Sequence, residues 1–95
     1  MEILFLVSRP ESAPLLRAFL RACVRRQIEW SCFFTGPAAA LALDPDISPL
    51  LKGSTGSAVC EYSWERFGSG HCPIALGSQT DNSALAATAH RIVSL

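Results

Sequence analysis

The 95-residue sequence has little charge, and its charges cancel. Only 17% of its residues are charged, and eight basic side chains balance eight acidic ones, whereas a typical domain has about 25% charged residues. Five of the seven arginines lie between Arg9 and Arg26, where Glu2, Glu11 and Glu29 offset them. We interpret them as a solvated helix face. A neutral chain lacks the basic surface that nucleic-acid binding usually needs, so we expect no direct contact with nucleic acid.

The sequence also lacks a long apolar run. No stretch approaches the roughly 20 residues of a membrane span. The apolar run from Ile3 to Val7 is too short for a signal peptide and ends at Ser8. We therefore expect a cytoplasmic protein without membrane contacts.

Motifs for metals and nucleotides are missing as well. No Cys-x-x-Cys pair is present, and His71, Cys72 and His90 are not spaced as zinc ligands. There is no Gly-rich phosphate loop or dinucleotide fingerprint. We expect neither a metal nor a cofactor. Without a secretory signal, the four cysteines are expected to be free thiols.

Apolar residues, by contrast, are abundant at 49% of the chain. This content excludes a disordered chain. A domain of this length hides only about 60–65% of its unfolded surface. We therefore expect one domain over residues 1–95, with more apolar residues than a single copy can bury.

Apolar and β-forming runs predict five strands. The run Ile3–Val7 is continuously apolar, which is typical of a strand buried on both faces. The other predicted strands cover residues 28–35, 57–60, 73–76 and 91–95.

Helical patterns separate these strands. Six apolar residues share one helical face and predict a helix over residues 13–27: Leu15, Leu16, Phe19, Leu20, Cys23 and Val24. Ser12 is its expected N-cap. Shorter helical segments are predicted at 38–43, at 47–52, and at 83–89 with Asp81 or Asn82 as the cap. The periodicity of residues 61–67 fits either a strand or a helix. Strands alternating with helices predict a parallel α/β sheet with right-handed crossovers.

Reactive groups in such sheets gather at the carboxyl ends of the strands. Cys23 lies on the apolar helix stripe and Cys32 lies within a strand, so both are expected in the core. Cys60 instead ends a short apolar strand. If a helix follows, its macrodipole and free amides favour the thiolate. Glu61 and Glu65 oppose this effect, and Arg66 supports it.

Cys60 is therefore the candidate catalytic residue. Cys72 follows His71 in a Gly-rich segment. It is either an exposed bystander, which the position favours, or a resolving thiol for Cys60.

Four segments in this order resemble the DsrE-like sulfur-relay family, which includes the TusD-type subunits of a tRNA-thiolation relay. Met1 to Val7 is similar to the family's first strand, and residues 30–36 are similar to the strand end before its second helix. Residues 59–66 resemble the strand-Cys-helix segment, and 89–95 resemble the closing strand. The resemblance spans nearly the whole chain. The stretch between 36 and 56 is shorter here, and the residues after the cysteine are aromatic and acidic instead of small and basic.

The resemblance implies a three-layer α/β/α fold with a five-stranded parallel sheet and a helix over residues 61–67. It also implies that Cys60 accepts sulfane sulfur as a persulfide and passes it from a donor protein to an acceptor. Relatives assemble as trimers or hexamers, alone or with related subunits. We therefore expect some apolar residues at a subunit interface: Leu41, Leu43, Tyr62, Trp64 and Phe67.

Two other functions remain open. Some relatives lack the cysteine, so the chain is alternatively a non-catalytic partner or assembly subunit of the same fold. It is otherwise a small-molecule binding module, in which Tyr62, Trp64 and Phe67 line a pocket.

Overall fold

A computed structural model describes all 95 residues, which form five strands and six helical segments. The strands are β1 (Ile3–Val7), β2 (Trp30–Phe34), β3 (Ala58–Cys60), β4 (Ala75–Gly77) and β5 (Arg91–Ser94). The α-helices are α1 (Ala13–Arg26), α2 (Ser48–Leu51), α3 (Glu61–Phe67) and α4 (Gln79–Thr88). Two 3₁₀ segments are η1 (Pro10–Ser12) and η2 (Gly36–Leu43).

The five strands form one parallel sheet in the order β4-β3-β2-β1-β5. The chain is thus an α/β protein whose five-stranded, all-parallel sheet is flanked by helices, as the sequence predicted. β1 lies in the centre, which agrees with its continuous apolar run.

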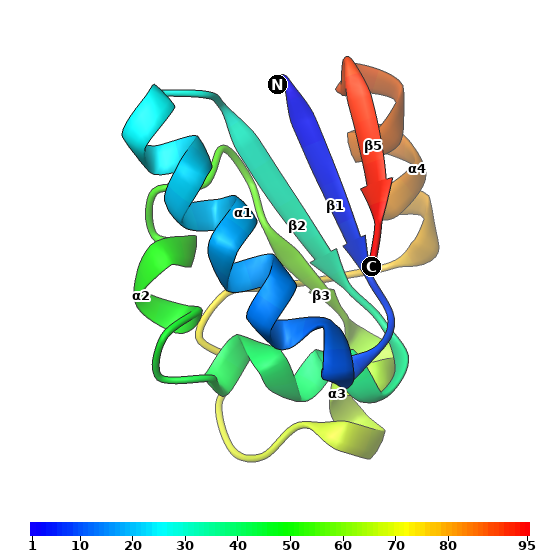
Figure 1. The fold of residues 1–95 in the computed structure, drawn as a ribbon. Helices are drawn as coiled ribbons and strands as arrows, with labels where there is room; N and C mark the ends of the chain where they lie inside the picture. Colours follow the sequence, from blue (N-terminus) through cyan, green and yellow to red (C-terminus); the bar gives the residue numbers. More distant parts are fainter.

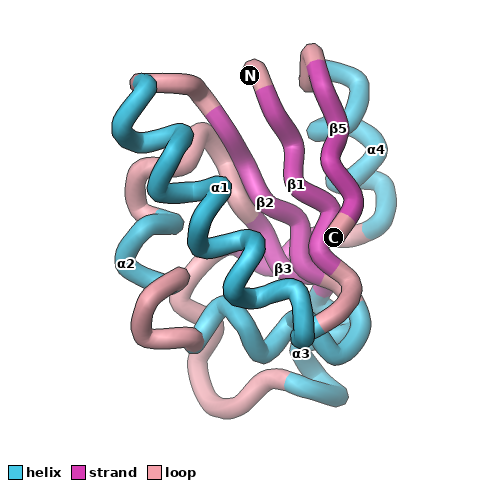
Figure 2. Tube along the Cα trace, viewed as in Figure 1, coloured by secondary structure: helices cyan, strands magenta, loops and turns pink.

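The helices cover the two faces of the sheet unequally (Figure 1). Successive strands from β1 to β4 advance in one direction, and residues of the intervening segments α1, η2, α2 and α3 belong to one core cluster. The last crossover runs in the opposite direction, from β4 back to β5. Parallel crossover connections are right-handed. The reversed direction therefore places α4 on the face of the sheet opposite to α1 (Figure 2).

Side chains that alternate along the strands divide the core in two. The larger cluster joins Phe5, Cys32 and Val59 to the helices of the α1 face. The smaller cluster contains Leu4, Phe33, Ala58 and Cys60, with Leu85, Ala86 and Ala89 of α4 packed against it. No residue of α4 is fully buried. The α4 face is therefore the lightly covered side of the sheet.

Two predicted helix starts differ from the structure. Ser12 occupies the N-cap of α1, but its hydroxyl donates to the Arg9 carbonyl at 2.6 Å instead of capping the helix. Asp81 and Asn82 do not cap α4, because the helix begins earlier, after Ser78. The Ser78 hydroxyl accepts from the Asp81 N–H, and the Asp81 carboxylate accepts from the Ser78 N–H, which forms a reciprocal capping box.

Two residues expected at a subunit interface lie in the core of the single chain. Leu41 and Trp64 are each 9% exposed and belong to the larger cluster. The Trp64 indole N–H donates to the Gly70 carbonyl at 3.2 Å. Its ring lies so close to Gly68 that a Cβ there would be 2.2 Å from a ring carbon. The glycine after α3 thus permits the burial of this tryptophan.

None of the helices combines the length and apolar character that crossing a membrane requires.

Candidate functional site

Cys60 lies at the junction of β3 and α3. It is the last residue of β3 and the N-cap of α3, and it is 6% exposed. The apolar residues Ala58 and Val59 are buried on opposite faces of the sheet, and the helix begins at the next polar residue, Glu61. The predicted strand end and the helix over 61–67 are both confirmed. The thiol is therefore held at the carboxyl edge of the sheet.

Hydrogen bonds from two elements favour the thiolate of Cys60. Burial raises the pKa of the thiol, but it is outweighed by hydrogen bonds from the Ser63 hydroxyl, the N–H groups of Ser63 and Tyr62, and the Gln79 side chain. The net pKa of Cys60 is below its ordinary value of 9.0. Hydrogen bonds to the charged form stabilise it. Cys60 therefore has a larger thiolate fraction at neutral pH than an ordinary cysteine.

Ser63 is oriented by a third segment. The Gly36 N–H donates to Ser63 Oγ at 2.8 Å, and Ser63 is buried. Because this contact occupies a lone pair of the hydroxyl, its proton is free to point at the Cys60 sulfur. Gly36 has a φ of +59°, which glycine adopts without strain. The site thus joins the ends of β2 and β3 to the start of α4.

Cys23 and Cys32 are core residues, as predicted. Both are buried in the larger cluster. Burial raises the pKa of Cys23. Burial also raises the pKa of Cys32, the nearby Cys23 raises it further, and a hydrogen bond with Ser57 opposes the shift. Burial therefore favours the neutral thiol at Cys23 and Cys32, whereas hydrogen bonds lower the pKa of Cys60.

Cys72 is not an exposed bystander, which corrects the favoured interpretation. It is 7% exposed and belongs to the larger cluster, whereas Cys60 belongs to the smaller one. These clusters lie on opposite faces of the sheet, and neither cysteine is in a disulfide. Flanking glycines suggested a surface loop, but the segment folds back against the core near Trp64. The structure does not bring the two thiols together.

Two contacts of the thiol were absent from the sequence predictions. Ser63 follows Cys60 at the spacing of an N-cap and its N3 residue, a pattern that could have identified it. Gln79 comes from α4 and reaches Cys60 through the pairing of Cys60 with Gly77. Only the fold could have identified that contact. The charges of Glu61, Glu65 and Arg66, which were expected to matter, do not contribute to the pKa of Cys60. That pKa is set by burial, which raises it, and by hydrogen bonds, which lower it.

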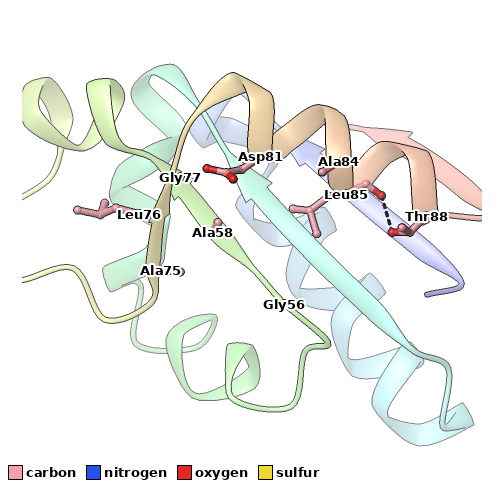
Figure 3. Close-up of a pocket in the computed structure, with 9 residues that line it drawn as sticks. All are labelled: Gly56, Ala58, Ala75, Leu76, Gly77, Asp81, Ala84, Leu85 and Thr88. Atoms are coloured by element: carbon pink, nitrogen blue, oxygen red, sulfur yellow. Dashed lines mark hydrogen bonds between the residues drawn. The ribbon is translucent and has the colours of Figure 1, made fainter.

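A cavity of about 400 Å³ lies on the α4 face, between that helix and the edge of the sheet (Figure 3). Small residues of β3, β4 and α4 dominate its lining, which is made by Gly56, Ala58, Ala75, Leu76, Gly77, Asp81, Ala84, Leu85 and Thr88. Tyr62, Trp64 and Phe67 are not among them, so this cavity does not support the alternative in which these aromatics line a pocket.

Nowhere do three or more His, Cys, Asp or Glu side chains form a group that could hold a metal ion. The Cys60 site itself supplies a thiol and the hydrogen-bond donors around it. No family model matches the chain, and no curated protein matches it at a significant level.

Proposed function

We propose that this protein is a sulfur carrier of the DsrE-like type, which accepts sulfane sulfur on Cys60 and passes it on. The observation that carries the proposal is the thiol at the end of β3, where donors from α3 and α4 lower its pKa despite burial. The order of segments that resembles the family supports the same role.

The chemistry requires only a thiolate. The Cys60 sulfur attacks the outer sulfur of a donor persulfide, the S–S bond of the donor breaks, and the donor leaves as a thiolate with the bonding electron pair. The outer sulfur, with its proton, is then bonded to Cys60. An acceptor thiolate takes it by the same step in reverse, and no net oxidant or reductant is consumed.

Ser63 and Gln79 have a defined part in this cycle. They donate to the attacking thiolate, and the same donors face the sulfur that becomes the leaving group when the persulfide is discharged. A leaving thiolate of lower pKa departs faster. The hydrogen bonds therefore assist both loading and discharge.

Loading with inorganic polysulfide followed by intact-protein mass spectrometry tests this function. We expect the wild-type chain to gain the mass of one sulfur atom and to lose it on treatment with a thiol. Cys60→Ser should gain nothing, and Cys32→Ala should load as the wild type does. Loading of Cys60→Ser to the wild-type extent would assign the sulfur to another cysteine and reject the proposal.

A second candidate is an assembly subunit of the same fold, and exposed apolar side chains favour it. Leu43, Tyr62 and Phe67 are 43%, 65% and 40% exposed. We propose that they contribute to an oligomer interface. A trimer or hexamer in sedimentation equilibrium that dissociates in Tyr62→Glu supports this interface. A wild-type monomer contradicts it. An assembly whose Cys60 fails to load would favour the assembly role over sulfur transfer.

A further inference from the structure

The cavity on the α4 face lies next to the strand end that holds Cys60. Ala58 lines it, and Cys60 lies two residues further along β3 on the same face, about 6.6 Å away along the strand. Both belong to the smaller core cluster. On the neighbouring strand β4, Gly77 pairs with Cys60 in the sheet register and also lines the cavity. The cavity thus reaches the two residues next to Cys60, Ala58 along the strand and Gly77 across it, while Cys60 itself lies just outside the lining.

Small side chains produce this cavity. Ala58, Ala75, Gly77 and Ala84 leave space where larger residues would fill the gap between α4 and the sheet. Its volume of about 400 Å³ lies within the roughly 300–1,000 Å³ of small-molecule sites. The walls thus offer apolar contacts to a ligand with an aliphatic body.

One charged side chain lines the cavity, and it lies at the thiol end. Asp81 stands within 3.3 Å of a Cβ built on Gly77, the partner of Cys60. One carboxylate oxygen, Oδ2, accepts from the Ser78 N–H and hydroxyl at 2.7 and 3.0 Å. The Ser78 N–H and then its hydroxyl lower the pKa of Asp81, which keeps the carboxylate ionised. Its other oxygen remains available, so the cavity favours a cation near the sulfur and disfavours an anion.

We propose that this cavity binds the carbon body of a small aliphatic aminothiol, whose persulfide is the sulfur donor to Cys60. The ammonium group lies at Asp81 and the alkyl part lies along Ala58, Ala84 and Leu85. This inference rests on the proposed function of Cys60 and names its substrate class.

The proposed transfer is a displacement at sulfur. The Cys60 thiolate attacks the outer sulfur of the aminoalkyl persulfide and forms a new S–S bond. The aminothiol leaves as its thiolate, which keeps the electron pair of the broken bond. The outer sulfur keeps its proton and stays on Cys60.

Stable disulfides serve as probes, because the Cys60 thiolate attacks them by the same kind of displacement. Mixed-disulfide formation is followed by mass spectrometry with cystamine, bis(2-hydroxyethyl) disulfide and dithiodipropionate, which differ in charge. We expect cystamine to react fastest and dithiodipropionate slowest. In Asp81→Asn, the ratio of these two rates should fall about fivefold, the upper end for an exposed ion pair. An unchanged ratio would overturn the proposed ammonium site.

A fourth disulfide, that of 2-amino-4-methylpentanethiol, tests the apolar wall. Its isobutyl group should raise the rate about tenfold over cystamine, as burial of two methylene groups provides. Ala84→Leu fills the cavity and should remove this gain. Ala87→Leu, on the same helix but outside the lining, should retain it. Equal gains in both variants would overturn the proposal.

Polysulfide loading of the same variants separates the two hypotheses. Polysulfide has no carbon body, so Ala84→Leu should load as the wild type does. Suppose that polysulfide loads both the wild type and Ala84→Leu, but that the disulfide with the isobutyl group reacts no faster than cystamine with the wild type. This result would reject the aminothiol site and leave the sulfur-carrier function intact. A wild-type chain that does not load would reject the proposed function itself.

Discussion

Ser63→Ala should shift the pH dependence of Cys60 reactivity, and a matched serine variant separates this shift from structural damage. The substitution removes the hydroxyl that donates to the Cys60 sulfur and accepts from the Gly36 N–H. Both Cys60 and Ser63 are nearly fully buried. Solvent therefore does not readily replace the lost hydrogen bond, and the pKa of Cys60 should rise.

The size of the effect follows from the energy of that contact. A hydrogen bond to a charged group contributes about 1.5–3 kcal/mol, and each 1.4 kcal/mol is about tenfold in an equilibrium. The thiolate fraction at neutral pH should therefore fall about ten- to hundredfold. A more basic thiolate is also more nucleophilic, with a Brønsted coefficient of about 0.4–0.5. On a logarithmic scale, the higher nucleophilicity offsets roughly half of the loss in thiolate fraction. The rate of Cys60 alkylation at neutral pH should therefore be about three- to tenfold lower in Ser63→Ala than in the wild type.

Iodoacetamide alkylation of Cys60, measured from pH 6 to about pH 11, should reveal two crossing profiles. The variant should react more slowly at low pH, where its thiolate is scarce. It should react faster at high pH, where both thiols are ionised and the more basic thiolate is the better nucleophile.

Ser57→Ala is the matched control. Ser57 is also a buried serine that accepts a backbone N–H, from Cys32 at 2.9 Å, but it lies outside the Cys60 site. Both variants should lose about 1–3 kcal/mol of stability from an unpaired buried N–H. Only Ser63→Ala should shift the Cys60 profile. A uniformly lowered profile in Ser63→Ala, or the same shift in the control, would refute the reasoning.

Three further predictions concern stability. Gly68→Ala should cost about 1–3 kcal/mol in urea denaturation, because the added Cβ overlaps the Trp64 ring; an unchanged midpoint would show that the ring moves freely. Because the pKa of Cys32 is raised above 9.0, its contribution to stability is present below that pH. Above pH 9.0 this contribution should be lost at about 1.4 kcal/mol per pH unit. Urea denaturation at pH 8 and 10 should therefore show a smaller loss of stability with pH in Cys32→Ala than in the wild type. Ser78→Ala should cost about 1 kcal/mol by removing half of the capping box with Asp81; an equal effect of Ser83→Ala would contradict that assignment.

Local pattern was sufficient for much of the fold. The continuous apolar run Ile3–Val7 identified the central strand, and the stripe on residues 13–27 identified α1, because burial on a sheet imposes these periods. The position of Cys60 at a strand end was also accessible, since it depends on residues 57–67 alone. The all-parallel sheet followed from the alternation of these elements.

Features that depend on distant residues were not accessible. Cys72 has glycines on its N-terminal side, which suggested exposure, but the fold of residues 68–74 places it against the core. Gln79 reaches Cys60 only because β4 pairs with β3. The cavity exists because small residues of β3, β4 and α4 leave space between that helix and the sheet. Such contacts arise from tertiary packing, which no local period encodes.

The most direct test of the central claim is to locate the sulfur among the four cysteines. The protein is treated with less than one equivalent of labelled polysulfide, its thiols and persulfides are blocked by alkylation, and its peptides are analysed by mass spectrometry. The lowered pKa and edge position of Cys60 predict that the label lies on Cys60, while Cys23, Cys32 and Cys72 remain unmodified. Label spread over all four cysteines, or concentrated on any of the other three, would contradict the account.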